Sequence, residues 1–297
     1  MDHSLVRKVT NVIRDLPTLP SVVNRINALL NDPKTQVADL AQVISADQSL
    51  SVKVLQHINS AYFGVYKTND LQRAIVRLGF RSVSQIVTNV SICSMFRDDN
   101  EGFFDRSEFW RHSIAVAVLS RMIASRARHP RPDEAFTCGL LHDVGKLILD
   151  QYLHPEMTKV LRCAHQNKIT FIEAEQRTTM PIDHTTIGEL AAKTWRLPIV
   201  AVVSIRHHHT PLEERKGLPL SDDIMVDIVR YADHLAHEIG IGESGNGAPP
   251  EWSPDLVARL AVDAESIAAI REVCLAEIGE TAAFLDLPVR QRAADPA

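Results

Sequence analysis

The chain has 297 residues, of which 45% are hydrophobic and 23% are charged, a composition typical of an ordinary globular protein. Its formal net charge of −5 gives no broad attraction to nucleic acid or to an anionic membrane surface. No apolar run is long enough to span a bilayer, and the four cysteines include no CxxC pair. We therefore expect a cytoplasmic protein with reduced thiols and with no nucleic-acid or membrane partner.

Residues 1–100 predict an N-terminal subdomain of short helices. Apolar residues recur at helical spacing in five segments, which turn-forming residues separate: 21–30, 37–44, 50–58, 71–78 and 83–95. The polar stretch at 97–102 is the expected hinge to the rest of the chain. Because few residues alternate with the period of a strand, we predict an all-α fold of two packed helical subdomains.

Residues 101–240 predict the second helical subdomain, which contains an unusual polar pair. His142 and Asp143 are neighbours in the apolar segment LLHDVGK, which we expect to be one helix. A buried carboxylate costs roughly several kcal/mol unless a cation or hydrogen bonds compensate it. The adjacent imidazole favours a divalent metal as that compensation, so we predict a metal site here.

Further histidines occur at the ends of predicted helices in this subdomain. His112 begins a long apolar helix, His184 follows the candidate N-cap Asp183, and three consecutive histidines occupy 207–209. Each of them alone is more often a structural or solvent-facing residue than a metal ligand. Most other histidines, His237 among them, have no comparable setting and are predicted to be surface or packing residues.

A helix predicted at 221–239 carries acids on two faces. Asp233 falls within its apolar stripe, where an unpaired acid is out of place. Asp223 and Asp227 fall on the opposite face, which we expect to be solvated.

Residues 241–297 form the last predicted part of the chain. Glycine, serine and proline at 243–250 indicate a flexible loop. One or two helices are expected between about 254 and 285, followed by a loose tail.

Four N-terminal segments carry a resemblance to a known family: LPTLP at 16–20, DQSL at 47–50, NSAYFG at 59–64 and AIVRLG at 74–79. In this order, ahead of the His-Asp pair, they resemble the HDOD family, signalling relatives of the HD superfamily of metal-dependent phosphohydrolases. The resemblance covers roughly residues 14–240 and implies an HD-like helical bundle for the second subdomain. Gln48 stands where the family usually has proline, which weakens the start of one helix.

The resemblance implies a set of metal ligands and one or two divalent transition-metal ions, Fe, Mn or Zn. Seven positions match those that hold metal in the binuclear HD enzymes: His112, His142, Asp143, His184, His208, His209 and Asp233. Glu108 stands where some relatives place a further ligand. His207 remains an alternative to His208 as a ligand.

Two functions stay open. The resemblance favours a signalling or regulatory protein that binds a protein partner, or a nucleotide or other phosphorylated ligand. The near-complete ligand set favours a phosphohydrolase, in which Asp143 and Lys146 would be catalytic. Two roles stay open for Lys146: it could contact a phosphate near the metal, or it could only form an ion pair with Asp143. The loop after His209 lacks the Gly-Tyr-Pro signature of related cyclic di-GMP phosphodiesterases, so we do not expect that activity. We favour the regulatory function.

Overall fold

The computed structural model describes residues 11–12, 18–58, 68, 70–96, 103–250 and 254–285. Within these ranges the regular structure is helical and contains no strand, which confirms the predicted all-α fold. The NSAYFG motif at 59–64, the expected hinge at 97–102 and the C-terminal tail lie outside the described residues. None of the described helices has the length and apolar character needed to cross a membrane.

The chain forms two compact units. One is built on residues 98–275, and the other on residues 17–97 together with 276–287. Helix α15 (Ala264–Leu285) therefore contributes its first part to the larger unit and its last part to the smaller one. The division of the sequence at residues 100 and 240 stays a prediction.

Among the described residues, the N-terminal segment of the smaller unit contains the helices α2 (Ser21–Leu30), α3 (Val37–Ser45), α4 (Gln48–Ile58) and α5 (Leu71–Met95). The side chain of Asp70 accepts hydrogen bonds from the backbone amides of Gln72 and Arg73 in the first turn of α5. The two helices predicted at 71–78 and 83–95 follow each other directly, with a kink at Gly79, whose φ of +81° suits glycine.

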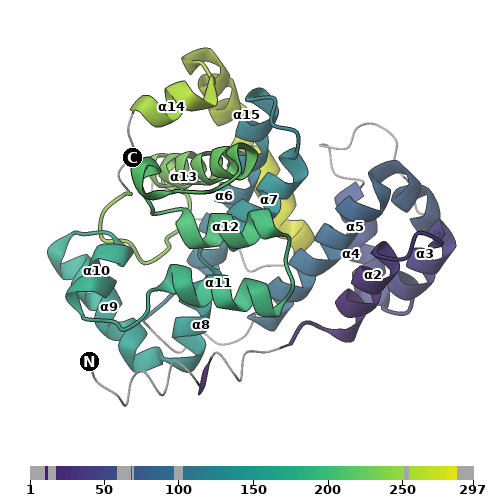
Figure 1. Ribbon diagram of the computed structural model, residues 1–297, viewed down its shortest axis with the longest axis horizontal. Helices are drawn as coiled ribbons and strands as arrows, with labels where there is room; N and C mark the ends of the chain where they lie inside the picture. The colour runs from purple at the N-terminus through teal and green to yellow at the C-terminus, as the bar shows by residue number, and fades with distance from the viewer. Residues whose placement is uncertain are drawn as a thin grey trace, which may run out of the picture. The chain divides into compact units, whose positions relative to one another are not determined.

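The larger unit contains the remaining helices and a short 3₁₀ turn: α6 (Arg106–Arg126), α7 (Pro132–Leu141), α8 (Val144–Tyr152), α9 (His154–Asn167), α10 (Phe171–Arg177), α11 (His184–Thr194), α12 (Ile199–His207), η2 (Leu212–Glu214), α13 (Leu220–Ile239) and α14 (Pro254–Leu260). Figure 1 shows α13, α12, α11 and α8 stacked in this order.

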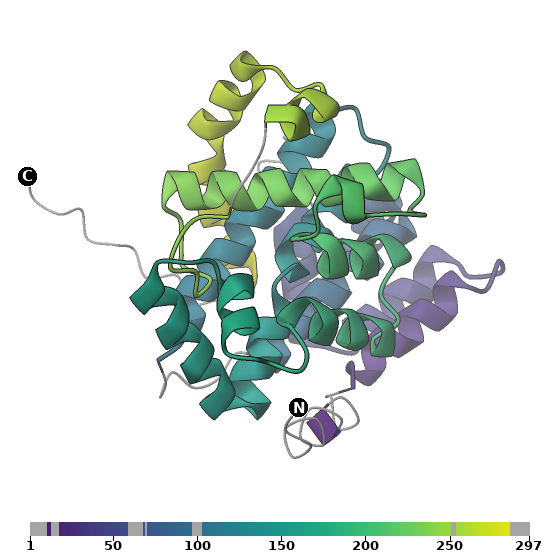
Figure 2. The ribbon, with the colours of Figure 1, turned by 60° about the vertical axis from the view of Figure 1, so that its left-hand side comes forward.

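Helix α6 is the central element of the larger unit. Its residues from Phe109 to Val118 are buried apart from Arg111, and both α7 and α13 pack on it. Figure 2 shows α13 lying across this helical pair. Gly139 permits the close approach of α7, because a Cβ there would lie 2.7 Å from the carbonyl oxygen of Val116.

The expectation of one helix through the His-Asp pair is wrong. Helix α7 ends at Leu141 and α8 begins at Val144, so His142 and Asp143 form the junction between them. In a continuous helix, neighbouring side chains point about 100° apart. At this junction His142 Nε2 lies 3.2 Å from Asp143 Oδ2, so the break brings the two side chains to one place.

Candidate metal centre

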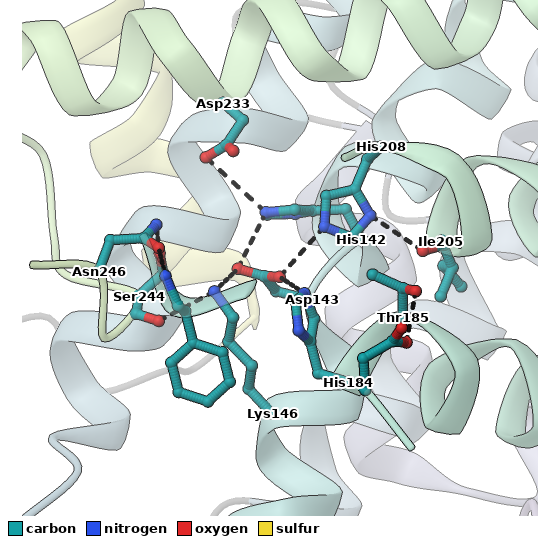
Figure 3. A network of polar contacts seen from close by, with 12 residues as sticks. His142, Asp143, Lys146, His184, Thr185, Ile205, His208, Asp233, Ser244 and Asn246 are labelled. Atoms are coloured by element: carbon teal, nitrogen blue, oxygen red, sulfur yellow. Dashed lines mark hydrogen bonds and ion pairs between the residues drawn. The ribbon is translucent and has the colours of Figure 1, made fainter. Parts of the chain in front are cut away.

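Two groups of histidines and aspartates lie beside each other in the larger unit. The ligand atoms within each group lie within 4.8 Å of one another, which is close enough to share a metal ion. The first group comprises Asp143, His184, His208 and His209, and the second comprises His112, His142 and Asp233. The structure thus brings together all seven residues that the sequence nominates. Figure 3 shows Asp143 together with His142, His184, His208 and Asp233.

In the first group the histidines surround one oxygen of Asp143. Asp143 Oδ1 lies 3.2 Å from His184 Nε2 and 3.4 Å from His208 Nε2. The His209 ring lies 4.1 Å from that of His208 and 5.2 Å from that of His184, measured between centroids. Three imidazoles and one carboxylate form a donor set that suits Zn, Fe or Mn.

In the second group the histidines surround one oxygen of Asp233. Asp233 Oδ1 lies 2.9 Å from His112 Nε2 and 3.9 Å from His142 Nε2. The other oxygen of Asp143, Oδ2, faces His142 at 3.2 Å. Asp143 therefore presents one oxygen to each group, as a carboxylate between two ions would do.

Hydrogen bonds on the far side of three rings determine which nitrogen faces the centre. The Nδ1 of His142 lies 2.7 Å from the Gly139 carbonyl, and that of His208 lies 2.9 Å from the Ile205 carbonyl. The Nδ1 of His184 lies 2.7 Å from Glu175 Oε2. Because these oxygens only accept, each Nδ1 donates a proton to them. In the neutral form of each ring, the lone pair therefore lies on Nε2 and points inward.

Eight buried atoms of the ligand residues make no hydrogen bond among the described residues. They are both ring nitrogens of His112, the Nε2 atoms of His142, His184, His208 and His209, and the Oδ1 atoms of Asp143 and Asp233. Buried polar atoms are nearly always paired, so such a concentration indicates a missing partner. With the rings neutral, seven of the eight atoms offer a lone pair, because one nitrogen of His112 then carries a proton. A cation is the partner that lone pairs need. The residues present thus fit a metal.

Protonation states at the centre largely match those of metal ligands. Burial alone would raise the pKa of Asp143 and Asp233, but neighbouring groups, chiefly Lys146 for Asp143 and His112 for Asp233, hold both well below their usual value. Burial lowers the pKa of His208 to about 4 and that of His209 well below its usual range. These four side chains are therefore in their metal-binding forms at neutral pH.

His142 and His184 are the exceptions. Burial alone would lower the pKa of His142, but the charge of Asp143 and hydrogen bonds raise it. Burial alone would also lower the pKa of His184, but the charge of Glu175 and hydrogen bonds raise it to about 9. A metal ion bound there would have to displace this proton.

Lys146 is fully buried beside the centre. Its Nζ donates to Asp143 Oδ2 at 2.7 Å and to the Ser244 carbonyl at 3.1 Å (Figure 3), and it lies 4.8 Å from the centre of the Phe171 ring. Of the two interpretations of Lys146, the structure contains the ion pair, although in the interior and not on a helix surface. Contact with phosphate stays a prediction.

Comparison with known proteins agrees with these observations. Residues 16–211, more than half of the chain, match the family described as the HDOD domain. The chain belongs to the HDOD family. An uncharacterized protein of Treponema pallidum (strain Nichols) is 27% identical to this HDOD protein over 215 residues, covering 69% of the chain. The chain spans only 40% of the length of that relative.

Solved structures share the fold. An HDOD domain protein of unknown function from Geobacter sulfurreducens superposes with a TM-score of 0.74 at 26% identity, covering 95% of this chain and 96% of its own. A "Putative metal-dependent phosphohydrolase" from Shewanella amazonensis SB2B gives 0.67 at 21% identity, covering 95% and 98%. A "Putative signal transduction protein" from Marinobacter aquaeolei VT8 gives 0.69 at 20% identity, covering 95% and 66%.

Glu108, the possible further ligand, and His207, the alternative to His208, lie outside both groups of the HDOD protein. Glu108 belongs to neither group, and its carboxylate lies 3.6 Å from Arg111 Nη1. His207 also belongs to neither, and its Nδ1 lies 3.3 Å from the Thr210 hydroxyl. The geometry therefore favours His208 over His207.

Two residues beside the centre are missed by sequence reasoning. His237, expected to be a packing or surface residue, lies with its Nε2 3.5 Å from Asp233 Oδ1, and its ring lies 4.6 Å from that of His112. Its spacing of four residues from Asp233 on a helix is a signal that could have found it. Glu175, which accepts from both the backbone and the ring of His184, has no such signal.

The expectation of a solvated face for Asp223 and Asp227 is wrong. Both residues are buried, and both pair with Arg215 and Arg259. The reason is that helix α14 and the segment after His209 cover this face of α13 and supply the two guanidinium groups.

The segment at 243–250 is a loop, as predicted, but hydrogen bonds and close packing hold part of it. Ser244 is buried, and its carbonyl accepts from Lys146. The amide of Gly247 donates to the carbonyl of Ile169 at 2.9 Å.

Proposed function

We propose that this HDOD protein is a signalling or regulatory protein whose HD-like site binds two divalent transition-metal ions, Fe, Mn or Zn. The observation that carries the proposal is the convergence of seven unpaired, buried lone-pair atoms in two adjacent groups. One ion would be held by Asp143, His184, His208 and His209, and the other by His112, His142 and Asp233 with Asp143 between them. The family supports the signalling role, which would require a protein partner.

Burial of the site supports regulation over turnover. The side chains of His112, His142, Asp143 and His184 are at most 2% exposed. Lys146, the residue that would contact a phosphate, already has two oxygen partners and an aromatic ring around its ammonium. A nucleotide or other phosphorylated molecule would then act as a ligand that the protein senses.

The second candidate is a metal-dependent phosphohydrolase acting on a nucleotide or another phosphoester. The complete set of seven ligands favours it, because a metal pair polarises a phosphoryl group and activates water. In that case Asp143 would position both ions, and Lys146 would neutralise charge on the phosphoryl group once its present partners were displaced. The missing Gly-Tyr-Pro signature argues against cyclic di-GMP as the substrate.

Metal analysis of the purified protein, followed by a panel of nucleotides and phosphodiesters, separates these possibilities. We expect about two transition-metal ions per chain and no turnover of cyclic di-GMP. Chelator-sensitive hydrolysis of any member of the panel would move the assignment to the phosphohydrolase. Absence of bound metal after growth with added Fe, Mn and Zn would contradict the proposal.

A further inference from the structure

The chain after α13 crosses the metal centre as a strap, which we define as residues 241–247. Figure 2 shows the chain leaving α13 and running toward α9 and α10. Two main-chain hydrogen bonds hold its ends: Glu243 N donates to the Glu108 carbonyl at 3.1 Å, and Gly247 N donates to the Ile169 carbonyl at 2.9 Å.

Two glycines let the strap lie directly on neighbouring helices. Gly242 has a φ of +70°, and a Cβ there would lie 2.3 Å from the backbone nitrogen of His112. A Cβ on Gly247 would lie 2.0 Å from the carbonyl oxygen of Ala164. Side chains at these positions would force the backbone away, so the close fit of the strap depends on its glycines.

The middle of the strap takes up polar groups that face the centre. The Ser244 carbonyl accepts from Lys146, and Asn246 Nδ2 lies 3.1 Å from His237 Nε2 (Figure 3 shows Ser244 and Asn246). The amide of Phe171 donates to Asn246 Oδ1 at 2.7 Å, which orients the Asn246 amide with its NH₂ toward His237.

With the Ser244 carbonyl in place, Lys146 has no N–H group left to donate to a ligand. The three N–H groups of a lysine are accounted for here by Asp143 Oδ2, the Ser244 oxygen and the face of the Phe171 ring. A phosphate oxygen could reach Nζ only in place of the Ser244 oxygen, because Asp143 is needed between the two metal groups.

We propose that the strap is a lid that keeps the site closed, with the Ser244 carbonyl occupying the position at Lys146 where an oxygen of an anionic phosphoryl ligand would bind. This inference rests on the proposed function, since the metal site defines the ligand. The strap is the part of the enclosure best able to move. Hydrogen bonds and glycines hold it over Lys146, and Ile241 is its one buried apolar side chain, whereas each of the surrounding helices buries several.

Gly242→Ala tests the lid, with Gly217→Ala as its matched control. Both glycines have positive φ, +70° and +80°, but a Cβ on Gly217 would have no atom within 4 Å. Both variants therefore carry the same backbone strain, and only Gly242→Ala pushes the strap off α6. Asn246→Ala is a second variant, which loosens the strap without adding atoms.

Amide hydrogen exchange and binding of inorganic phosphate are the two measurements. We expect Gly242→Ala to raise amide hydrogen exchange at 243–247 about tenfold or more, and to tighten binding of inorganic phosphate by about tenfold, while Gly217→Ala behaves as wild type. The gain in phosphate affinity should disappear in the double variant with Lys146→Met. Faster exchange without tighter phosphate binding would overturn the lid, and so would unchanged exchange. If Gly242→Ala does not fold, the same two measurements on Asn246→Ala decide.

Metal content of the same samples distinguishes the two hypotheses. A metal-free wild type would contradict the proposed function. The lid would still stand if Gly242→Ala showed the Lys146-dependent gain in phosphate binding. Full metal content without that gain would contradict the lid alone.

Discussion

Helix α13 carries two regions with buried aspartates, and their surroundings differ in kind. Near its start, Asp223 pairs with Arg215 at 3.0 Å and with Arg259 at 2.5 Å, and Asp227 pairs with the same two arginines. Near its end, Asp233 faces the ring nitrogens of His112, His142 and His237 at 2.9–3.9 Å.

The residues that surround a buried acid distinguish a structural ion pair from a candidate metal site. Arginine always carries a positive charge and has donors but no lone pair, so the arginine region is complete by itself. Neutral histidine carries no charge and offers a lone pair, so the histidine region concentrates acceptors, and those of His112, His142 and Asp233 have no hydrogen-bond partner among the described residues. The first region ties helices together, whereas the second requires a cation from outside.

The largest expected effect comes from Asp143→Ala, which removes the carboxylate shared by both metal groups. We expect the bound metal to fall to a small fraction of the wild-type amount, measured by elemental analysis, while helical content by circular dichroism persists. His207→Ala is the control, because His207 neighbours a ligand but lies in neither group, and it should keep its metal. Wild-type metal content in Asp143→Ala would show that the site is assigned wrongly.

In the arginine region, Arg215→Met should destabilise the larger unit without affecting its metal. The substitution leaves Asp223 and Asp227 buried with one arginine, and breaking a buried pair costs about 3–5 kcal/mol. Denaturant unfolding measures the loss. Arg73→Met, in the exposed pair with Asp70, should cost at most about 1 kcal/mol. Loss of metal from folded Arg215→Met would remove the contrast between the regions.

Removing the metal should destabilise the histidine region and leave the arginine region unaffected. A ligand at a free concentration about 100 times its Kd stabilises the folded state by about 2.7 kcal/mol per site. A chelator should therefore lower the melting temperature of wild type and of Arg215→Met, but not that of Asp143→Ala. Equal shifts in all three would mean that the chelator acts elsewhere.

The contrast between the two regions also separates the features that the sequence predicts from those that it does not. Helical periodicity predicts the elements well, and Asp183 acts as the expected N-cap of α11. The seven clustered residues were found because polar residues stand out within apolar helices and because their order resembles one family. Both signals are local to the chain.

Other features depend on segments that only the fold brings together. Asp223 and Asp227 look solvated on a helical wheel, because the arginines that pair with them lie outside the helix. Arg215 is eight residues from Asp223 along the chain, and Arg259 is 36 residues from it. Glu175 reaches His184 from the preceding helix, where nothing in its own sequence context distinguishes it from a surface acid. No periodicity predicts such pairings.

A smaller effect is expected from Glu175→Gln, which keeps the shape of the group that holds His184. The substitution weakens the hydrogen bond to Nδ1 and removes the charge that raises the pKa of His184. Changes at such supporting residues typically cost about 10–100-fold in metal affinity. Competition with a metal-binding dye measures it. Glu173→Gln, an exposed acid two residues earlier on α10, should leave the affinity unchanged.

The smallest effect is expected from Asp183→Ala, which tests whether every acid near the centre serves the metal. Asp183 neighbours His184, yet its carboxylate accepts from Thr186 N and the Thr185 hydroxyl, both at 2.7 Å, and belongs to neither group. Losing this N-cap should cost about 1 kcal/mol in unfolding free energy, with metal content unchanged.

The pH dependence of that loss identifies its origin. Burial alone would raise the pKa of Asp183, but the hydrogen bonds from Thr185 and Thr186 lower it below the usual value. A carboxylate with a lowered folded-state pKa contributes stability above its unfolded pKa of about 3.9, and loses it as the pH falls through the folded value. The difference in unfolding free energy between wild type and Asp183→Ala should therefore be full at pH 7 and shrink below about pH 4.

Asp183→Asn is the control, because asparagine can still cap the helix. It should retain more stability than Asp183→Ala but lack the acid-dependent part. Loss of metal from Asp183→Ala would instead place this acid with Asp143 and Asp233.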